Sequence, residues 1–402
     1  MVQARDSVAV VAPNVAVTVA LCFLVAVVEG FDIQAMGVAA PRLAPQFGLT
    51  PQQLGWVFSI SNIGLVIGAS TGGWLADRVG RKPVFIGAVL TFGVFTLLTT
   101  VTSTFDGLFA MRFLAGLGFG AALPNMMAVA AEVSAPEKRA STAAVMFCGM
   151  PLGGGSSALL TQLLPPDFDW RILFIMGGIL PLLLAPLLYF LMPETLVKRS
   201  GTAARASIAT ALFAEGRTPA TLLLWLAFLP TLLILYLILN WLPTLVVANG
   251  LERAVEPQAS LAFNFASVAG ALVFGKLVDR AGGRWPLTIA YMGVIASLIF
   301  LSNSHGLAST LFLSGAAGFF LLGANYALYG VAATYYPQNV RGTGSGASVA
   351  IGRVGSIIGP LLAGILLGGG TTASGVVQYM VPVAALAGLA VFGLSYCRRP
   401  AH

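Results

Sequence analysis

The sequence predicts an all-α membrane protein, and three observations lead to this prediction. Of the 402 residues, 57% are hydrophobic and only 9% are charged, whereas soluble globular domains carry about 25% charged residues. Apolar runs of about 20 residues, long enough to cross a bilayer, recur along the chain. The stretch GWLADRVGRK at 73–82 also recurs in outline as GKLVDRAGGR at 275–284. Together these features predict twelve transmembrane helices in two similar six-helix bundles.

The predicted helices follow one another with short connections. In chain order they occupy residues 15–40, 51–76, 83–102, 107–131, 141–164, 171–193, 219–247, 257–277, 285–302, 307–333, 343–368 and 376–396. The longest connection is polar. We therefore predict an N-terminal bundle at residues 1–194, a cytoplasmic linker at 195–218 and a C-terminal bundle at 219–402.

The basic residues predict the orientation of these helices, because Lys and Arg concentrate in cytoplasmic loops. With a cytoplasmic N-terminus, 16 of the 21 Lys and Arg residues lie on the cytoplasmic side, three lie outside and two lie within helices. Both termini are therefore predicted to be cytoplasmic. The net charge of +7 is then a topology signal and requires no nucleic-acid partner. The three cysteines form no CxxC pattern, so neither a disulfide framework nor a metal site is predicted.

The internal repeat has one constant offset. At 202 residues, Gly73, Asp77, Arg78 and Gly80 recur as Gly275, Asp279, Arg280 and Gly282, and Arg139 recurs as Arg341. Internal repeats of membrane helices are typical of secondary transporters, whose substrate site lies between the repeats near the middle of the bilayer. The repeat therefore indicates a transporter.

Several motifs resemble those of the major facilitator superfamily. The sequence Gly-x-x-x-Asp-Arg-x-Gly-Arg-Lys at 73–82 is similar to its signature loop between the second and third helices. RFLAGLG at 112–118 resembles its fourth-helix motif. GMPLGGG at 149–155 resembles its fifth-helix motif, with Met150 where a glycine is usual. The resemblance covers the whole chain.

Within the superfamily, four stretches resemble the aromatic acid:proton symporters. They are EGFDIQAMGVAAPRLAPQFGL at 29–49, AALPNMMAVAAE at 121–132, LYLILNWLPTL at 235–245 and GRVGSIIGP at 352–360. The opening EGFD resembles the 3-(3-hydroxyphenyl)propionate transporter branch. The resemblance implies a monomeric symporter of the bacterial inner membrane, which imports an aromatic carboxylate by alternating access. Its coupling ion would be the proton, and no cofactor is implied.

Three charged residues are predicted to couple transport to protons. Glu29 and Asp32 lie inside the first helix, three residues apart and on one face. A charge at the centre of a membrane helix costs roughly 2.5–3.5 kcal/mol, so these acids are expected to face a cavity or a partner. Arg112 lies at a similar depth to Asp32, and the superfamily fold implies that their helices adjoin. We predict that Asp32, aided by Glu29, takes up the proton and that Arg112 sets its protonation; a permanent structural ion-pair network is the alternative.

Arg353 is predicted to bind the carboxylate of the substrate. It lies near the middle of the eleventh helix, and no acidic residue lies within the predicted helices of that bundle well away from their ends. A planar guanidinium binds a carboxylate through two parallel hydrogen bonds. The alternative is that Arg353 reaches across to Glu29 and is structural.

An aromatic acid also needs flat walls and a few hydrogen bonds. Besides Arg353, the predicted substrate contacts are Asn240, Trp241, Asn125, Tyr326 and Tyr236. Further polar residues at comparable positions are Asn264, Asn325 and Tyr329. Packing explains an aromatic side chain in a span equally well, and interhelical hydrogen bonding explains an asparagine, so both interpretations stay open.

A cytoplasmic gate is predicted where the second helix meets the cytoplasm. Its residues are Gly73, Asp77, Arg78, Arg81, Glu132, Arg139, Asp279 and Arg280. In the superfamily such charges join the two halves when the protein is open outward. The second copy is degraded, since Gly283 replaces a basic residue. The alternative is that these charges only set topology and the tight turn.

An exporter of amphipathic compounds on the same fold is the alternative function. The partial fifth-helix motif favours export, whereas an intramembrane cation favours an anionic substrate. The sequence contains no Gly-x-Ser-x-Gly, His-Glu-x-x-His or nucleotide-binding loop, so neither an enzyme nor an ATP-driven pump is predicted.

Overall fold

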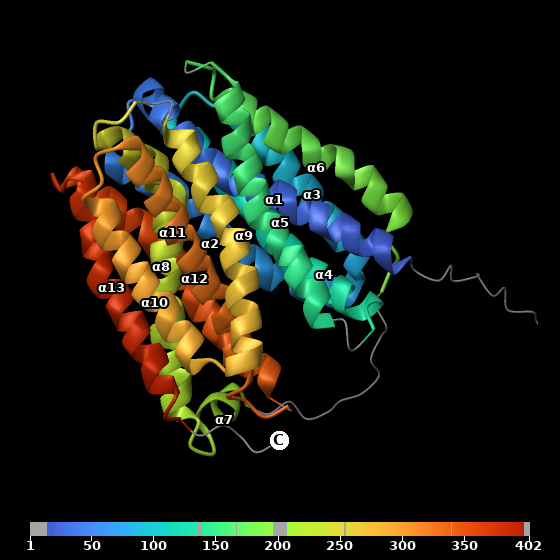
Figure 1. The fold of residues 1–402 in the computed structure, drawn as a ribbon. Helices are drawn as coiled ribbons and strands as arrows, with labels where there is room; N and C mark the ends of the chain where they lie inside the picture. The colour runs from blue at the N-terminus through green and yellow to red at the C-terminus, as the bar shows by residue number, and fades with distance from the viewer. Residues whose placement is uncertain are drawn as a thin grey trace, which may run out of the picture.

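The computed structural model describes residues 14–135, 139–165, 167–195, 207–252, 255–338 and 340–397. Figure 1 shows the helices that run through these residues. In chain order they are α1 (Val15–Phe47), α2 (Pro51–Val79), α3 (Arg81–Thr99), α4 (Phe105–Val133), α5 (Arg139–Leu163), α6 (Arg171–Leu191), α7 (Ile208–Phe213), α8 (Thr218–Ala248), α9 (Val255–Ala281), α10 (Arg284–Ser302), α11 (Leu307–Ala333), α12 (Arg341–Gly368) and α13 (Ala373–Leu394).

Each predicted transmembrane range coincides with most of one long helix, whereas the six-residue α7 was not predicted. Eleven helices of the described part are long and apolar enough to cross a membrane. Helix α5 has 25 residues, but several of its side chains lie outside the described part and it is not among the eleven. The protein is therefore a multi-pass membrane protein, and the count of twelve crossings stays a prediction.

The helices form two groups with the same packing pattern. In the first group α1 packs on α5 and α6, α2 packs on α4, and α3 packs on α4 and α6. In the second group α8 packs on α12 and α13, α9 packs on α11, and α10 packs on α11 and α13. Helices α6 and α13 lie at opposite outer edges in Figure 1. The limits of the predicted linker stay a prediction, because residues 196–206 lie outside the described part.

The two groups meet mainly along three helix pairs. Helix α1 packs on α8, α2 packs on α12, and α5 packs on α9. The α2–α12 and α5–α9 pairs are equivalent in the two groups. In the packing pattern, α9 of the second group corresponds to α2 of the first, and α12 corresponds to α5. The distances between these interface helices set the size of any pocket between the two groups.

Two glycines bring interface helices unusually close together. A Cβ at Gly30 of α1 would lie 2.0 Å from the backbone oxygen of Met150 in α5. A Cβ at Gly355 of α12 would lie 2.1 Å from the backbone oxygen of Leu229 in α8. Both distances are shorter than any van der Waals contact, so only glycine permits this backbone approach, as is common where membrane helices pack.

Candidate functional site

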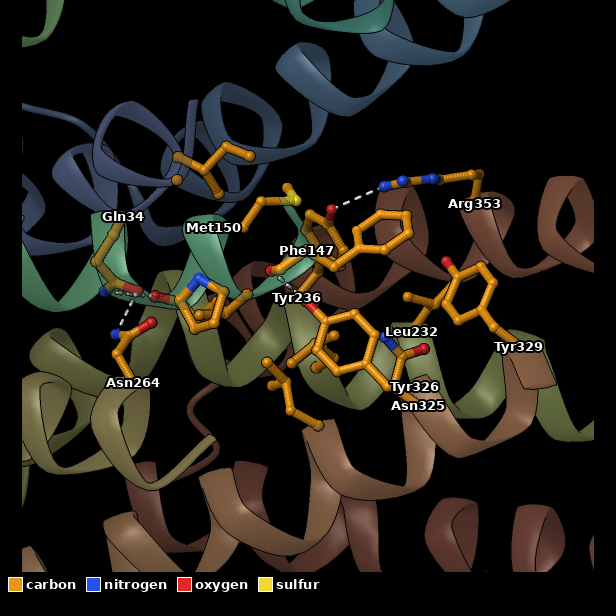
Figure 2. A pocket seen from close by; sticks show the side chains of 16 residues that line it. Gln34, Phe147, Met150, Leu232, Tyr236, Asn264, Asn325, Tyr326, Tyr329 and Arg353 are labelled. Atoms are coloured by element: carbon orange, nitrogen blue, oxygen red, sulfur yellow. Dashed lines mark hydrogen bonds between the residues drawn. The ribbon is translucent and has the colours of Figure 1, made fainter. Parts of the chain in front are cut away.

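A pocket lies between the two helix groups, and Figure 2 shows it from close by. It contains about 650 Å³ of empty space, its opening to solvent included. Helices α1 and α5 line it from the first group, and α8, α9, α11 and α12 line it from the second. Its polar residues are Gln34, Tyr236, Asn264, Asn325, Tyr326, Tyr329 and Arg353, and its apolar residues include Phe147, Met150, Leu232 and Leu235.

Arg353 is the cation on the wall of this pocket. Its Nη1 donates a hydrogen bond to the Tyr236 hydroxyl at 2.8 Å, a contact drawn in Figure 2. It forms no salt bridge with any described residue. The charge of Arg353 nevertheless interacts electrostatically with Tyr329 and with Glu29 of the opposite group. The guanidinium is therefore held by a neutral hydroxyl, and its remaining N–H groups can bind an anion.

Asp32 and Arg112 form the buried ion pair that the sequence predicts. Arg112 Nη2 lies 2.7 Å from Asp32 Oδ2, and its Nη1 lies 3.3 Å from Oδ1. The side chains are 0% and 1% exposed. The guanidinium also lies 5.5 Å from the centre of the Phe174 ring. This fork-to-fork geometry neutralises Asp32 inside the first helix group.

Glu29 is the buried acid without such a partner. Its side chain is 0% exposed, and neither carboxyl oxygen has a hydrogen bond to a described residue. The charges that act on it are those of Arg353, across the bundle interface, and Asp32, one turn along α1. A buried carboxylate is unfavourable unless it is paired or protonated, so the charge state of Glu29 depends first on its burial and then on these two neighbours.

Two of the hydrogen bonds that cross between the helix groups at the pocket wall use a carbonyl that a proline leaves free. Proline has no N–H, so the carbonyl four residues before it lacks its helical donor. The Tyr326 hydroxyl donates to the Phe147 carbonyl at 3.2 Å, and a proline of α5 follows four residues later. Gln34 Nε2 donates to the Leu239 carbonyl at 3.1 Å, and a proline of α8 follows four residues later.

The predicted substrate contacts divide between the pocket and other places. Arg353, Tyr236 and Tyr326 line the pocket. Asn240 lines a second, smaller pocket that also contacts Arg112, and its Nδ2 donates to the backbone one turn earlier.

Trp241 and Asn125 are not on the pocket wall. The Trp241 indole donates to the Pro360 carbonyl at 2.9 Å, and its ring packs edge-on against Phe58. Asn125 Nδ2 donates to the Ala121 carbonyl of its own helix at 2.8 Å. These are the interhelical and local contacts that the sequence left open as the alternative to substrate binding.

The pocket residues that were not predicted include Gln34, Phe147 and Met150. Gln34 carried a usable signal, because an amide inside an apolar helix needs a hydrogen-bond partner. Phe147 and Met150 carried none, since apolar side chains occur on every face of a membrane helix.

The predicted cytoplasmic gate makes its described contacts within the first helix group. Arg81 forms a salt bridge with Glu132 at 2.9 Å. Glu194 accepts the backbone N–H groups of Arg81 and Lys82 at 3.0 and 3.2 Å, a favourable place for a carboxylate at the start of α3. Gly80, with a φ of +122°, makes the turn that precedes them.

The remaining gate residues make no described contact between the groups. Those with exposed side chains are Asp77, Arg78, Asp279 and Arg280. A Cβ at Gly73 would meet no atom within 4 Å, and the side chain of Arg139 lies outside the described part. Their role as a latch between the two halves therefore stays a prediction.

An ion pair joins the two groups on the opposite side of the molecule. Arg42, near the end of α1, pairs with Glu256, at the start of α9. Both side chains are buried, and the Arg42 guanidinium lies 4.4 Å from the centre of the Phe168 ring. In the described part of the chain, therefore, a charged contact between the groups is found at this end and not at the gate.

The fold and the pocket define a secondary membrane transporter. Two helix groups with one packing pattern enclose a polar pocket between them, and helices interrupted by proline contribute to its wall, as in transporters built from repeats. The sequence profile of the Major Facilitator Superfamily matches residues 22–256, more than half of the chain. The chain therefore belongs to the major facilitator superfamily, and the prediction that it is not an enzyme is confirmed.

Similar proteins are named as transporters of aromatic acids. The chain is 40% identical over 375 residues to the 3-(3-hydroxy-phenyl)propionate transporter of Escherichia coli, covering 93% of each. It is 35% identical to the 4-hydroxybenzoate transporter PcaK of Pseudomonas aeruginosa, covering 93% of this chain and 91% of that one. It is also 35% identical to the gallate transporter of Pseudomonas putida, covering 86% and 84%. The predicted resemblance to 3-(3-hydroxyphenyl)propionate transporters is thus confirmed.

Among solved structures, a bacterial homologue of the human lysosomal transporter Spinster, in an inward-facing and unoccupied conformation, has the same fold. The TM-score is 0.75 at 15% identity, and the match covers 95% of this chain and 97% of that one. At this identity the likeness concerns the fold alone.

Proposed function

We propose that this protein imports an aromatic carboxylate together with a proton by alternating access. The observation that carries the proposal is Arg353, a guanidinium on a mostly apolar pocket wall that has no salt bridge to a described residue. A cation in such a place is costly unless an anion neutralises it. The named substrates of the three similar transporters reported above are aromatic carboxylates, which have one anionic end and one flat apolar body.

The binding mode follows from the two kinds of wall. The substrate carboxylate binds the free N–H groups of Arg353, which Tyr236 orients. Phe147 and Tyr326 pack against each other, with ring centres 5.8 Å apart, and together they form the aromatic wall on which the substrate ring lies. The polar face of the pocket thus fixes orientation, and the apolar face supplies most of the buried area.

Proton coupling follows from competition for Arg353. When Glu29 is ionised, it attracts the guanidinium of Arg353 across the interface. When Glu29 is protonated, that attraction ends and Arg353 binds the substrate carboxylate instead. Proton and substrate therefore bind together and leave together, which is the requirement for symport. The Asp32 carboxylate, which is paired with Arg112, lies one turn from Glu29, and its negative charge disfavours a second negative charge on Glu29.

We further propose a bacterial inner-membrane protein with twelve spans and both termini in the cytoplasm. The excess of Lys and Arg in the loops assigned to the cytoplasm supports this orientation. It puts the Arg42–Glu256 pair on the outer side, where a contact made in one state and broken in the other biases alternating access.

Uptake by proteoliposomes tests the proposal. We expect the wild type to accumulate labelled 3-(3-hydroxyphenyl)propionate when the outside is more acidic than the lumen, and a protonophore to abolish accumulation. Arg353→Gln should lower uptake by about thirtyfold or more, because losing one partner of a charged contact costs about 2–5 kcal/mol. Arg284→Gln is the matched control, since Arg284 contacts aromatic rings outside the pocket. If the wild type does not accumulate this acid, and other aromatic acids do not compete for its binding, import would be overturned and export favoured.

A further inference from the structure

The three amide side chains on the described pocket wall differ in their hydrogen-bond partners. Asn264 Nδ2 donates to Gln34 Oε1 at 3.2 Å and to the Ser260 carbonyl at 2.8 Å. Gln34 in turn donates to the α8 backbone. These two amides therefore have hydrogen-bond partners within the protein. Asn325 differs, because neither its Oδ1 nor its Nδ2 has a hydrogen bond to a described residue.

Asn325 is buried as well as unpartnered. Only 5% of it is exposed, and it lies on the pocket wall. Leaving a buried amide without hydrogen bonds costs about 1–3 kcal/mol, and most buried polar side chains have a partner. An amide kept in this state at the wall of a binding pocket is suited to a ligand that supplies the missing hydrogen bonds.

The position of Asn325 relative to Arg353 limits which part of a ligand can bind Asn325. Tyr329, which interacts electrostatically with Arg353, follows Asn325 by four residues on α11. The two side chains therefore share one helix face about one turn apart, with Cβ atoms about 5–6 Å from each other. Figure 2 shows both on the Arg353 side of the pocket, with Gln34 and Asn264 at the other end. One turn of helix is the scale of a benzene ring with its substituents.

We propose that Asn325 determines specificity by binding the ring hydroxyl of the substrate, so that the transporter selects hydroxylated aromatic acids over the same acids without the hydroxyl. The inference rests on the proposed function, in which Arg353 binds the carboxylate. An amide both donates and accepts, and so does a phenolic hydroxyl, so the two are matched. An acid that lacks the hydroxyl leaves Asn325 buried and unpaired, which is how a polar site rejects an apolar analogue.

Equilibrium binding to the purified full-length protein in detergent tests the inference with two acids of equal length. 3-(3-Hydroxyphenyl)propionate and 3-phenylpropionate differ only in the hydroxyl. For the wild type we expect the Kd of 3-phenylpropionate to be at least about tenfold higher. In Asn325→Leu the ratio should fall to about one, because the hydroxylated acid binds more weakly while 3-phenylpropionate does not. Asn62→Leu is the matched control, since Asn62 is buried, bonds only to its own helix and lies outside this pocket.

The contrary outcomes are distinct. Equal Kd values for the two acids in the wild type would overturn the inference and leave the proposed function standing. A ratio that survives in Asn325→Leu, or a loss of affinity that is the same for both acids, would also overturn it, because the residue would then be structural. Binding of neither acid by the wild type would overturn the proposed function and this inference with it.

Discussion

Replacing Asp32 by Asn measures the energy that the Asp32–Arg112 pair holds. The paired atoms are 2.7 and 3.3 Å apart and both side chains are buried. At an effective dielectric constant of about 20, unit charges 4 Å apart attract by about 4 kcal/mol. Removing one partner of a buried pair costs about 3–5 kcal/mol, because the other charge stays buried and unpaired. We therefore expect Asp32→Asn to lower the free energy of unfolding by about 3–5 kcal/mol.

A double-mutant cycle in mixed detergent micelles, with unfolding by sodium dodecyl sulfate followed by tryptophan fluorescence, measures this coupling. Arg112→Gln should cost as much as Asp32→Asn, and the double variant should cost little more than either, which corresponds to a coupling of about 3 kcal/mol. Asp169→Asn is the matched control. Its pair with Arg171 is exposed, so the loss should stay below about 1 kcal/mol.

The reasoning is refuted if Asp32→Asn costs no more than the exposed control, or if the two single losses add in the double variant. Either result would mean that Arg112 does not depend on Asp32 for its neutralisation. Asp32 could then bind and release the transported proton, and Glu29 would no longer be the one acid of this pair that lacks an ion-pair partner.

Two further predictions follow from the pocket and its helices. Glu29→Gln imitates the protonated form of Glu29, so binding of the aromatic acid to Arg353 should become independent of pH. Exchange of substrate across the membrane should survive, and accumulation driven by the pH gradient should be lost. If the variant still accumulates substrate, the proton must bind another group. Gly30→Ala puts a Cβ 2.0 Å from the α5 backbone and should lower the free energy of unfolding by about 3 kcal/mol or more. Gly73→Ala is the control, because a Cβ at Gly73 has open space around it and should not change this free energy. Equal stability of the two variants, measured by the same unfolding in micelles, would contradict the packing argument.

Much of the fold was predictable because the bilayer imposes one length on every spanning helix. The differences occur where the chain leaves that rule. Helix α1 runs seven residues past its predicted end, through Pro41 and Pro45, since proline is tolerated in membrane helices. Helix α7 lies in the polar connection and is too short to produce an apolar run.

The site was predictable only where a residue type is costly in a membrane. The charges of Asp32, Arg112 and Arg353 stand out in an apolar helix, and the pairing of the first two is confirmed. Trp241 and Tyr236 could not be told apart in this way. Helix α8 is apolar on every side, so periodicity does not distinguish its pocket face from its packing face.

By itself the sequence determined that this chain is a membrane protein of repeated helices, that it belongs among transporters, and which charges needed a partner. Composition and repeats are properties of the chain alone. Only the tertiary structure decided that Arg112 forms an ion pair with Asp32, while Glu29 has no ion pair among the described residues and interacts electrostatically with Arg353 across the interface. It also decided that Gln34 and Asn264 are hydrogen-bonded within the protein, whereas Asn325 has no hydrogen bond to a described residue. Which polar groups find partners depends on the rotation and spacing of helices far apart in sequence, and hydrophobicity does not encode either.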